Sequence, residues 1–255
     1  MLGACIGDII GSVYEYGNWK SRDFPLFSEK SEFTDDTVCT IAVAESLLDG
    51  TDPAAALRLW GRRYPGRGYG GRYAVWLKDP KMGPYNSSGN GAAMRVSPAA
   101  WLARSLEEAL AFARQVTEVT HNHPEGIKGA EATVTAIWLA RQGEAPVAIR
   151  RRIQDSFGYD LSRTVDEIRP DYRFNEFCQD TVPQAIVCAL EAASFEDTIR
   201  NAVSLGGDAD TLAAIAGPIA EVLHGIPEDI RRKSWMRLPK DMRDVLDRLY
   251  QQATA

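Results

Sequence analysis

The spacing of apolar residues constrains the fold of this chain more than any other feature of its sequence. In the range 38–48, Val38, Ile41, Ala42, Ala44, Leu47 and Leu48 lie three or four residues apart and would share one face of a helix. The same spacing recurs in the ranges 106–116, 132–140, 182–193, 198–205, 212–223 and 241–251. Alternating strand-like stretches are nearly absent, and helix-favouring Ala, Leu, Glu and Arg are abundant. The pattern predicts an all-α fold of about ten helices.

Two ranges interrupt this helical pattern. Gly and Pro are concentrated in residues 18–31 and 62–91, which we therefore expect to be long loops. Long loops in a compact domain are often functional. Arg62, Arg63, Arg67 and Arg72 lie among the glycines of the second range, and their ordinary interpretation is a solvated loop. Neither range looks like a Pro- or Ser-rich linker, so the sequence predicts one compact domain over residues 1–255.

The composition is that of an ordinary globular protein, with 45% hydrophobic and 25% charged residues. The formal net charge of -6 is opposite in sign to that expected of a protein that binds unmodified nucleic acid through phosphate neutralisation. No apolar run approaches the roughly 18 residues that a membrane helix needs, so we expect no membrane association.

The four cysteines and the start of the chain both predict a cytoplasmic protein. Cys5, Cys39, Cys178 and Cys188 form no CxxC pair, and three of them lie in apolar helical contexts. Buried reduced thiols are therefore expected, as suits a reducing compartment. The first residues also lack the basic and apolar regions of a signal peptide.

Two acidic clusters stand out, one in Phe33–Thr37 and one in Gly206–Thr211. Each places two aspartates and a threonine immediately before an apolar helix, expected to start near Val38 and near Leu212. One interpretation is helix N-capping, because Asp and Thr oxygens accept from the free backbone N–H groups and complement the helix dipole. A cap needs only one such residue, however, and here the excess occurs twice.

The second interpretation is a shared metal site. The oxygen ligands on offer suit Mg²⁺, Mn²⁺ or Ca²⁺ rather than Zn²⁺. If the two helix starts converge, four carboxylates meet, and their repulsion would raise the pKa values unless cations neutralise them. Two divalent cations would balance the four Asp charges and could lower the pKa of a bound water. The sequence by itself does not establish that the clusters converge.

Three further segments offer side chains for a site. Glu15 follows an apolar segment whose glycines, Gly7 and Gly11, suggest close helix packing, and by composition Glu15 is a surface group. The turn at residues 86–95 could present backbone N–H groups to phosphate oxygens, although an ordinary tight turn is the default. His121 and His123 share one helix connection; a histidine that contacts substrate is favoured over a zinc site, because no third histidine is nearby.

Five motifs follow one another along the chain: Gly7-Asp8-x-x-Gly11-x-x-x-Glu15, Phe33-Thr34-Asp35-Asp36-Thr37, Gly89-Asn90-Gly91-x-x-Met94-Arg95, Thr120-His121 and Gly206-Gly207-Asp208-x-Asp210-Thr211. In this order they resemble the ADP-ribosylglycohydrolase family, which includes the dinitrogenase reductase-activating glycohydrolases and the ADP-ribosyl-acceptor hydrolases of animals. The likeness runs from residue 2 to about residue 225. It implies an all-α orthogonal multi-helix bundle of that family's type.

The resemblance also implies a dinuclear Mg²⁺ or Mn²⁺ centre and a site for ADP-ribose or an ADP-ribosylated substrate. It assigns metal ligation to Thr34, Asp35, Asp36, Asp208, Asp210 and Thr211. It makes Glu15 a metal ligand or a gate. It assigns contacts with the diphosphate and distal ribose to Ser87, Ser88, Gly89, Asn90 and Gly91, and places His121 near the ADP-ribose. The chain is shorter than many members, which leaves the acceptor open.

The resulting hypothesis is hydrolysis of the bond at the anomeric carbon of the distal ribose, through an oxocarbenium-like transition state. One of Glu15, Asp36 and Asp210 would take the proton from water, and the sequence does not choose among them. Two alternatives are a module that binds ADP-ribose without turnover and a dinuclear phosphohydrolase that acts on the diphosphate.

Overall fold

The computed structural model describes residues 1–253, and all the regular secondary structure in this range is helical. The α-helices are α1 (Leu2–Gly11), α2 (Asp35–Asp49), α3 (Pro53–Arg63), α4 (Gly71–Lys78), α5 (Gly91–Met94), α6 (Ser97–Leu102), α7 (Leu106–Glu118), α8 (Pro124–Arg141), α9 (Pro146–Phe157), α10 (Val165–Ile168), α11 (Cys178–Glu191), α12 (Phe195–Ser204), α13 (Ala209–His224), α14 (Glu228–Trp235) and α15 (Lys240–Ala253). A short 3₁₀ helix, η1 (Glu15–Gly17), follows α1. The predicted all-α fold is confirmed.

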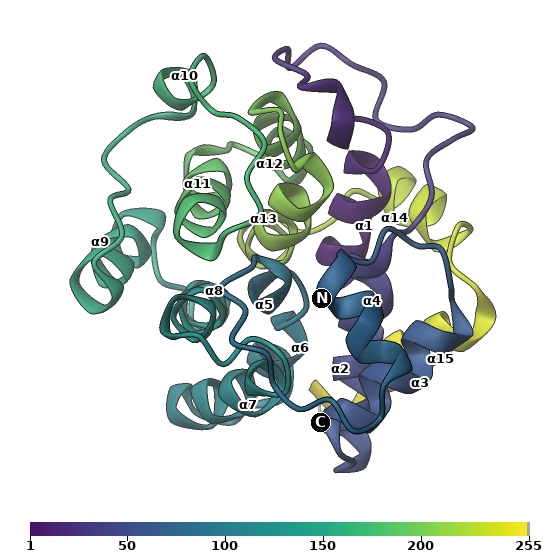
Figure 1. Cartoon of the computed structure of the whole chain (residues 1–255). Coiled ribbons are helices and arrows are strands. Elements are labelled where there is room, and N and C mark those ends of the chain that lie inside the picture. Colours follow the sequence, from purple (N-terminus) through teal and green to yellow (C-terminus); the bar gives the residue numbers. More distant parts are fainter. Residues whose placement is uncertain (254–255) are drawn as a thin grey trace.

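Helix α13 forms the centre of the molecule, with α1, α11 and α12 around it (Figure 1). Residues 209–220 of α13 are buried on every side, which is why this stretch reads as almost continuously apolar. The buried side chains of all the larger helices join one hydrophobic core, which includes Trp60, Trp76 and Phe195.

Helices α1 and α13 are in backbone contact. A Cβ added at Gly7 would lie 2.1 Å from the Ala213 carbonyl oxygen, and one at Gly3 would lie 2.4 Å from that of Gly217. Only glycine permits this approach. The prediction of close helix packing at Gly7 therefore holds, and the same packing brings the end of α1 beside the start of α13.

The sequence underestimated the helical content of residues 62–91. Helix α4 lies inside this range, where Tyr73, Trp76 and Leu77 are buried at helical spacing between glycines that hid the pattern. Arg62 and Arg63 end α3 instead of lying in a loop, and the guanidinium of Arg63 pairs with Asp241 at 3.0 Å. Helices α3 and α9 were also not among the predicted ranges, and neither were the short helices α5, α6, α10 and α14, whose three or fewer turns carry little periodicity.

Two further expectations, for residues 18–31 and for the cysteines, agree with the structure. Residues 18–31 form an irregular connection between η1 and α2. All four cysteines are buried free thiols. Within residues 1–253, no helix is both long and apolar enough to cross a membrane.

Candidate functional site

The first acidic cluster lies in the first turn of α2, not in front of it, since α2 begins at Asp35 and not near Val38. Thr34 is the N-cap, and its hydroxyl oxygen accepts from the backbone N–H of Asp36 at 3.3 Å. A second cap comes from outside the helix: the carboxylate of Asp8 in α1 accepts from the backbone N–H groups of Thr34 and Thr37, each at 3.0 Å. The remaining N–H, that of Asp35, donates to the Arg67 carbonyl at 2.7 Å, so capping is complete without the side chains of Asp35 and Asp36.

Asp8 is a site residue that the sequence analysis quoted in a motif but gave no role. It is fully buried, and it also accepts from the Thr34 hydroxyl at 2.7 Å. Burial raises the pKa of Asp8 to about 6, and its hydrogen bonds oppose that shift. The sequence did contain a signal for Asp8: it is a lone carboxylate in an otherwise apolar helix. Burying such a carboxylate is costly unless it has hydrogen-bond partners.

The second acidic cluster forms the start of α13, which begins at Ala209, a few residues before the expected Leu212. Gly206 and Gly207 lead into it with φ values of 72° and 70°, a conformation that favours glycine. The side-chain amide of Asn90 donates to Asp208 at 2.6 Å, which ties this cluster to the turn at residues 86–91. Asp210 accepts from the N–H of Thr211 at 2.9 Å.

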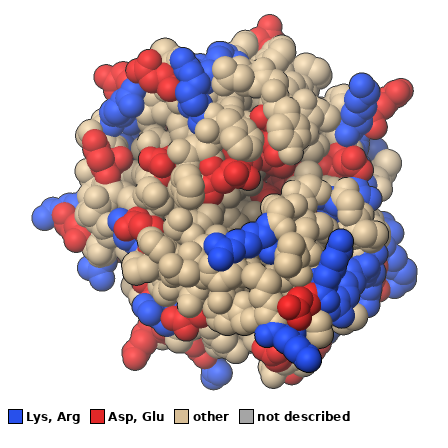
Figure 2. Space-filling view, in the orientation of Figure 1, with Lys and Arg blue, Asp and Glu red and all other residues tan. Residues whose placement is uncertain are grey.

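The two clusters converge, together with Glu15, on one cavity of about 420 Å³. Carboxylate oxygens of Glu15, Asp208 and Asp210 all lie within 4.8 Å of one another. Asp35 and Asp36 line the same cavity, and Oδ2 of Asp36 is buried without a hydrogen-bond partner. Glu15 is half-buried in the cavity wall, which corrects its expected place on the open surface. Figure 2 shows the mouth as a hollow near the centre of this face, with acidic side chains gathered along it.

Burial and mutual repulsion raise the pKa values of these carboxyl groups. Desolvation is the largest cause for each of them. The pKa of Asp35 rises to about 8, with the charge of Asp8 as the second cause, and that of Glu15 rises to about 7. The pKa values of Asp36 and Asp210 lie well above the usual range, and the neighbouring aspartates add to the effect. The cluster therefore favours cations or protons as partners.

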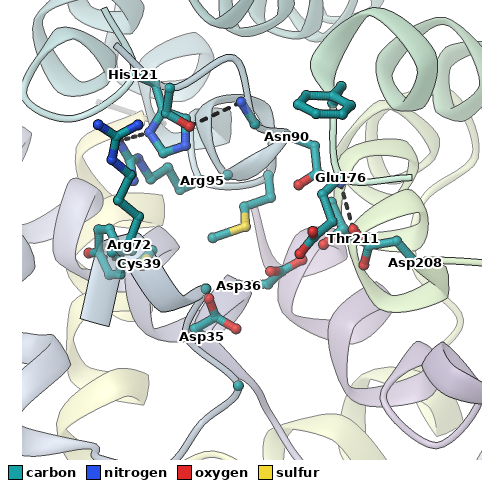
Figure 3. Close-up of a pocket in the computed structure, with 18 of the residues that line it drawn as sticks. Asp35, Asp36, Cys39, Arg72, Asn90, Arg95, His121, Glu176, Asp208 and Thr211 are labelled. Atoms are coloured by element: carbon teal, nitrogen blue, oxygen red, sulfur yellow. Dashed lines mark hydrogen bonds between the residues drawn. The ribbon is translucent and has the colours of Figure 1, made fainter. Parts of the chain in front are cut away.

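Another wall of the cavity is a glycine-rich turn, which touches Asp208 through Asn90 and has basic side chains behind its other part. Residues 86–91 line the cavity, and Arg72, Arg95 and His121 lie on the far side of it from the aspartates (Figure 3). Burial and the charge of Arg95 lower the pKa of His121 well below its usual value, so this imidazole is neutral. The cavity thus has an acidic end and a basic end.

The loop before α11 fastens this turn in place. Gly89 and Phe177 form an isolated antiparallel bridge, in which the N–H of Asn90 donates to the Glu176 carbonyl at 2.7 Å and that of Cys178 donates to the Ser88 carbonyl at 2.9 Å. The side chains of Glu176 and Phe177 line the cavity. Glu176 and Phe177 were not singled out from the sequence, because no local pattern places them beside residues 86–91. Arg72 and Arg95 were quoted from the sequence, in the Arg-rich stretch and in the motif that ends at Arg95, but neither was given a role in the site.

Most of the predicted site residues meet at this cavity. Its lining includes Glu15, Asp35, Asp36, Ser87, Ser88, Gly89, Asn90, Gly91, His121, Asp208, Asp210 and Thr211. Thr34 does not line it, and its hydroxyl donates to Asp8 at 2.7 Å. His123 caps α8 by accepting from the N–H of Glu125 at 3.1 Å, whereas His121 lines the cavity. The two histidines therefore have different roles, and the zinc alternative gains no support.

The side chains present fit hard divalent cations. Three convergent carboxylates, an unpartnered buried oxygen on Asp36 and the nearby hydroxyl of Thr211 are oxygen ligands of the kind that Mg²⁺ and Mn²⁺ prefer. Within residues 1–253, no histidine or cysteine belongs to the close group of possible ligands.

Comparisons with known proteins agree with this geometry. The family model described as ADP-ribosylglycohydrolase matches residues 1–255. The chain is 27% identical to human ADP-ribosylhydrolase ARH3, over 93% of this chain and 87% of that protein. It is also 27% identical to the ADP-ribosylarginine hydrolase Tri1 of Pseudomonas putida, over 97% of this chain and 77% of that one. A solved structure described as an ADP-ribosylglycohydrolase-related protein complex superposes with a TM-score of 0.74 at 26% identity, covering 99% of this chain and 95% of that chain.

The all-α fold and its carboxylate-lined cavity therefore define an enzyme of the glycohydrolase class. The chain belongs to the ADP-ribosylglycohydrolase family.

Proposed function

We propose that this enzyme is a divalent-metal-dependent hydrolase that cleaves the bond at the anomeric carbon of the distal ribose and releases ADP-ribose from a modified side chain or a small conjugate. The observation that carries the proposal is the polarity of the cavity. Six carboxylates lie at one end, and Arg72, Arg95 and part of a glycine-rich turn lie at the other. A substrate that spans it needs an anionic group at one end and sugar hydroxyls that can meet cations at the other.

At the acidic end, Asp35, Asp36, Asp208, Asp210 and Thr211 would hold two Mg²⁺ or Mn²⁺ ions. Thr34 would join them through a lone pair of its hydroxyl oxygen, whose proton goes to Asp8. Bound there, the ions would offset the carboxylate charges and lower the pKa of a nearby water. The hydrogen bonds that Asp8 accepts from Thr34 and Thr37 hold the first turn of α2, so Asp35 and Asp36 stay oriented toward the cavity.

At the basic end, residues Ser87, Ser88, Gly89, Asn90 and Gly91 would embrace the diphosphate and the distal ribose. Their backbone can approach a ligand closely because Gly89 and Gly91 carry no side chain. His121 stands directly behind both glycines and would contact the same part of the ligand.

Proton transfer from the attacking water falls to Glu15, Asp36 or Asp210. We favour Glu15, because it is half-buried at the cavity wall and burial raises its pKa to about 7, close to a working pH near neutral. The Oε atoms of Glu15 would accept the proton as the oxocarbenium-like centre is attacked. Asp36 and Asp210 are buried more deeply and are better suited to holding cations.

The test is turnover of ADP-ribosyl-arginine, ADP-ribosyl-serine and O-acetyl-ADP-ribose with Mn²⁺, with Mg²⁺ and with EDTA. We expect intact ADP-ribose as the product, only with metal, and loss of activity in Asp210→Asn. Asp155→Asn is a matched control on an exposed face of α9. AMP as the product would support phosphohydrolysis instead, and metal-dependent binding without any product would support a binding module.

A Glu15→Gln variant separates the candidate bases. We expect normal ADP-ribose binding and at least a hundredfold lower kcat, in line with the usual contribution of a general base. Full activity of Glu15→Gln would move the role to Asp36 or Asp210.

A further inference from the structure

Arg95 is a buried cation without a carboxylate partner. It follows α5, its exposed fraction is 1%, and no ion pair involves it within the part of the chain that the structure describes. Its guanidinium donates instead to the carbonyl of Val116 at 3.3 Å and to the hydroxyl of Thr120 at 2.6 Å. Burying a charge that no opposite charge offsets is costly, so a role at the cavity is needed to explain why Arg95 lies behind it.

The contact between Arg95 and Thr120 fixes the direction of a second hydrogen bond. Arginine can only donate, so the Thr120 oxygen accepts from Arg95 through one lone pair. If its second lone pair also accepted from His121, the proton of this buried hydroxyl would have no acceptor among the described residues, which is costly, so Thr120 donates. The acceptor within reach is Nδ1 of His121, at 2.7 Å. An N–H of Arg95 also approaches this nitrogen, at 3.5 Å, and would repel a proton there. Both contacts make Nδ1 of His121 an acceptor.

This arrangement determines what the other ring nitrogen does. A neutral imidazole carries one proton, so an acceptor at Nδ1 leaves the proton on Nε2. Nε2 faces the turn: a Cβ added at Gly91 would lie 3.1 Å from it, and one at Gly89 would lie 3.4 Å from it. Among residues 1–253, no group accepts a hydrogen bond from Nε2, so this donor is free for a ligand at the turn.

We propose that Arg95 is a positioning residue that acts through Thr120 to hold His121 as a neutral imidazole with its proton on Nε2, ready to donate to an anionic oxygen bound at residues 87–91. The identity of that anion as the diphosphate of ADP-ribose rests on the proposed function. The tautomer does not, because it follows from contacts within the chain itself. A neutral donor suits this place, since the ring lies beside the positive charge of Arg95.

The tautomer can be measured directly by ¹⁵N NMR of the imidazole side chains, because protonated and unprotonated ring nitrogens resonate far apart. The chain has only three histidines, and a His121→Gln variant assigns the signal of interest. We expect the Nε2–H form in the wild type at neutral pH. Thr120→Val removes the hydroxyl with little change of shape, so His121 should lose its preference for the Nε2–H tautomer. Thr120→Ser keeps a hydroxyl and should keep that preference. Arg95→Met should also abolish it.

A wild-type His121 with its proton on Nδ1 would overturn the proposal, as would a Thr120→Val protein with an unchanged tautomer. Merely structural roles for Arg95 and Thr120 would alter stability but leave the tautomer as it is. Circular dichroism checks that each variant folds.

Calorimetry with ADP-ribose tests the second half of the proposal. Losing an oriented donor to a charged group should weaken binding roughly tenfold in Thr120→Val but not in Thr120→Ser. Equal affinities in the two variants would contradict the role of Nε2 as a donor. A wild type with the Nε2–H form that neither binds ADP-ribose nor cleaves its conjugates would instead contradict the proposed function, so the two failures are distinguishable.

Discussion

The contact between α1 and α13 should control both stability and activity, and Gly7→Ala tests this. The new Cβ would lie 2.1 Å from the Ala213 carbonyl oxygen, whereas an ordinary contact begins at 3.4 Å, so the helices must separate by about 1.3 Å. The obstructing atom is backbone and cannot rotate away. We therefore expect a loss of about 3 kcal/mol in the free energy of unfolding, at the upper end of overpacking effects. In a chain of this length that lowers Tm by about 6–12 °C.

The same shift would reach the site. Asp8 follows Gly7 directly, and the first turn of α13 carries Asp210. A misplacement of about 1 Å can cost a hundredfold in rate, so we expect kcat to fall by about that factor in the folded protein. Urea unfolding and steady-state kinetics below the new Tm measure the two effects separately. Gly83→Ala is the control, because a Cβ there meets no atom within 4 Å. A Gly7→Ala protein as stable and active as Gly83→Ala would refute the reasoning.

Three further predictions concern the carboxylates and the turn. In EDTA, a thermal-shift assay should show Tm falling as pH rises from about 4 to about 8. The folded-state pKa values of Glu15 and Asp35 rise to about 7 and about 8, so the protonated forms that stabilise the folded protein are lost over that window. Mn²⁺ should flatten this dependence of Tm on pH. Asp8→Ala should weaken Mn²⁺ binding at least tenfold by calorimetry, since the N–H groups of Thr34 and Thr37 at the start of α2 lose their partner. Unchanged affinity would exclude a positioning role for Asp8. Gly91→Ala should raise the Kd for ADP-ribose because its Cβ would lie 3.1 Å from Nε2 of His121, and an unaltered Kd would mean that the ligand does not use this face of the turn.

The sequence by itself determined the fold class and the chemistry of the clusters. Helical spacing of apolar residues specifies helices locally, and the excess of carboxylates at two helix starts indicates more than capping. The same rules failed at α4, where glycines obscure a buried face made by Tyr73, Trp76 and Leu77, and they placed the start of α2 three residues late. Both errors arise because the burial of a face depends on what packs against it.

Only the tertiary structure decided which residues meet. Asp8 caps a helix that begins 27 residues later, Asn90 bonds Asp208 across 118 positions, and Glu176 clasps the turn at residues 86–91. The contacts that give Arg95 and His121 their roles likewise connect separate helices. Local spacing carries no information on such pairings, because they depend on how glycine contacts let α1 approach α13 and so bring distant helix starts to one cavity.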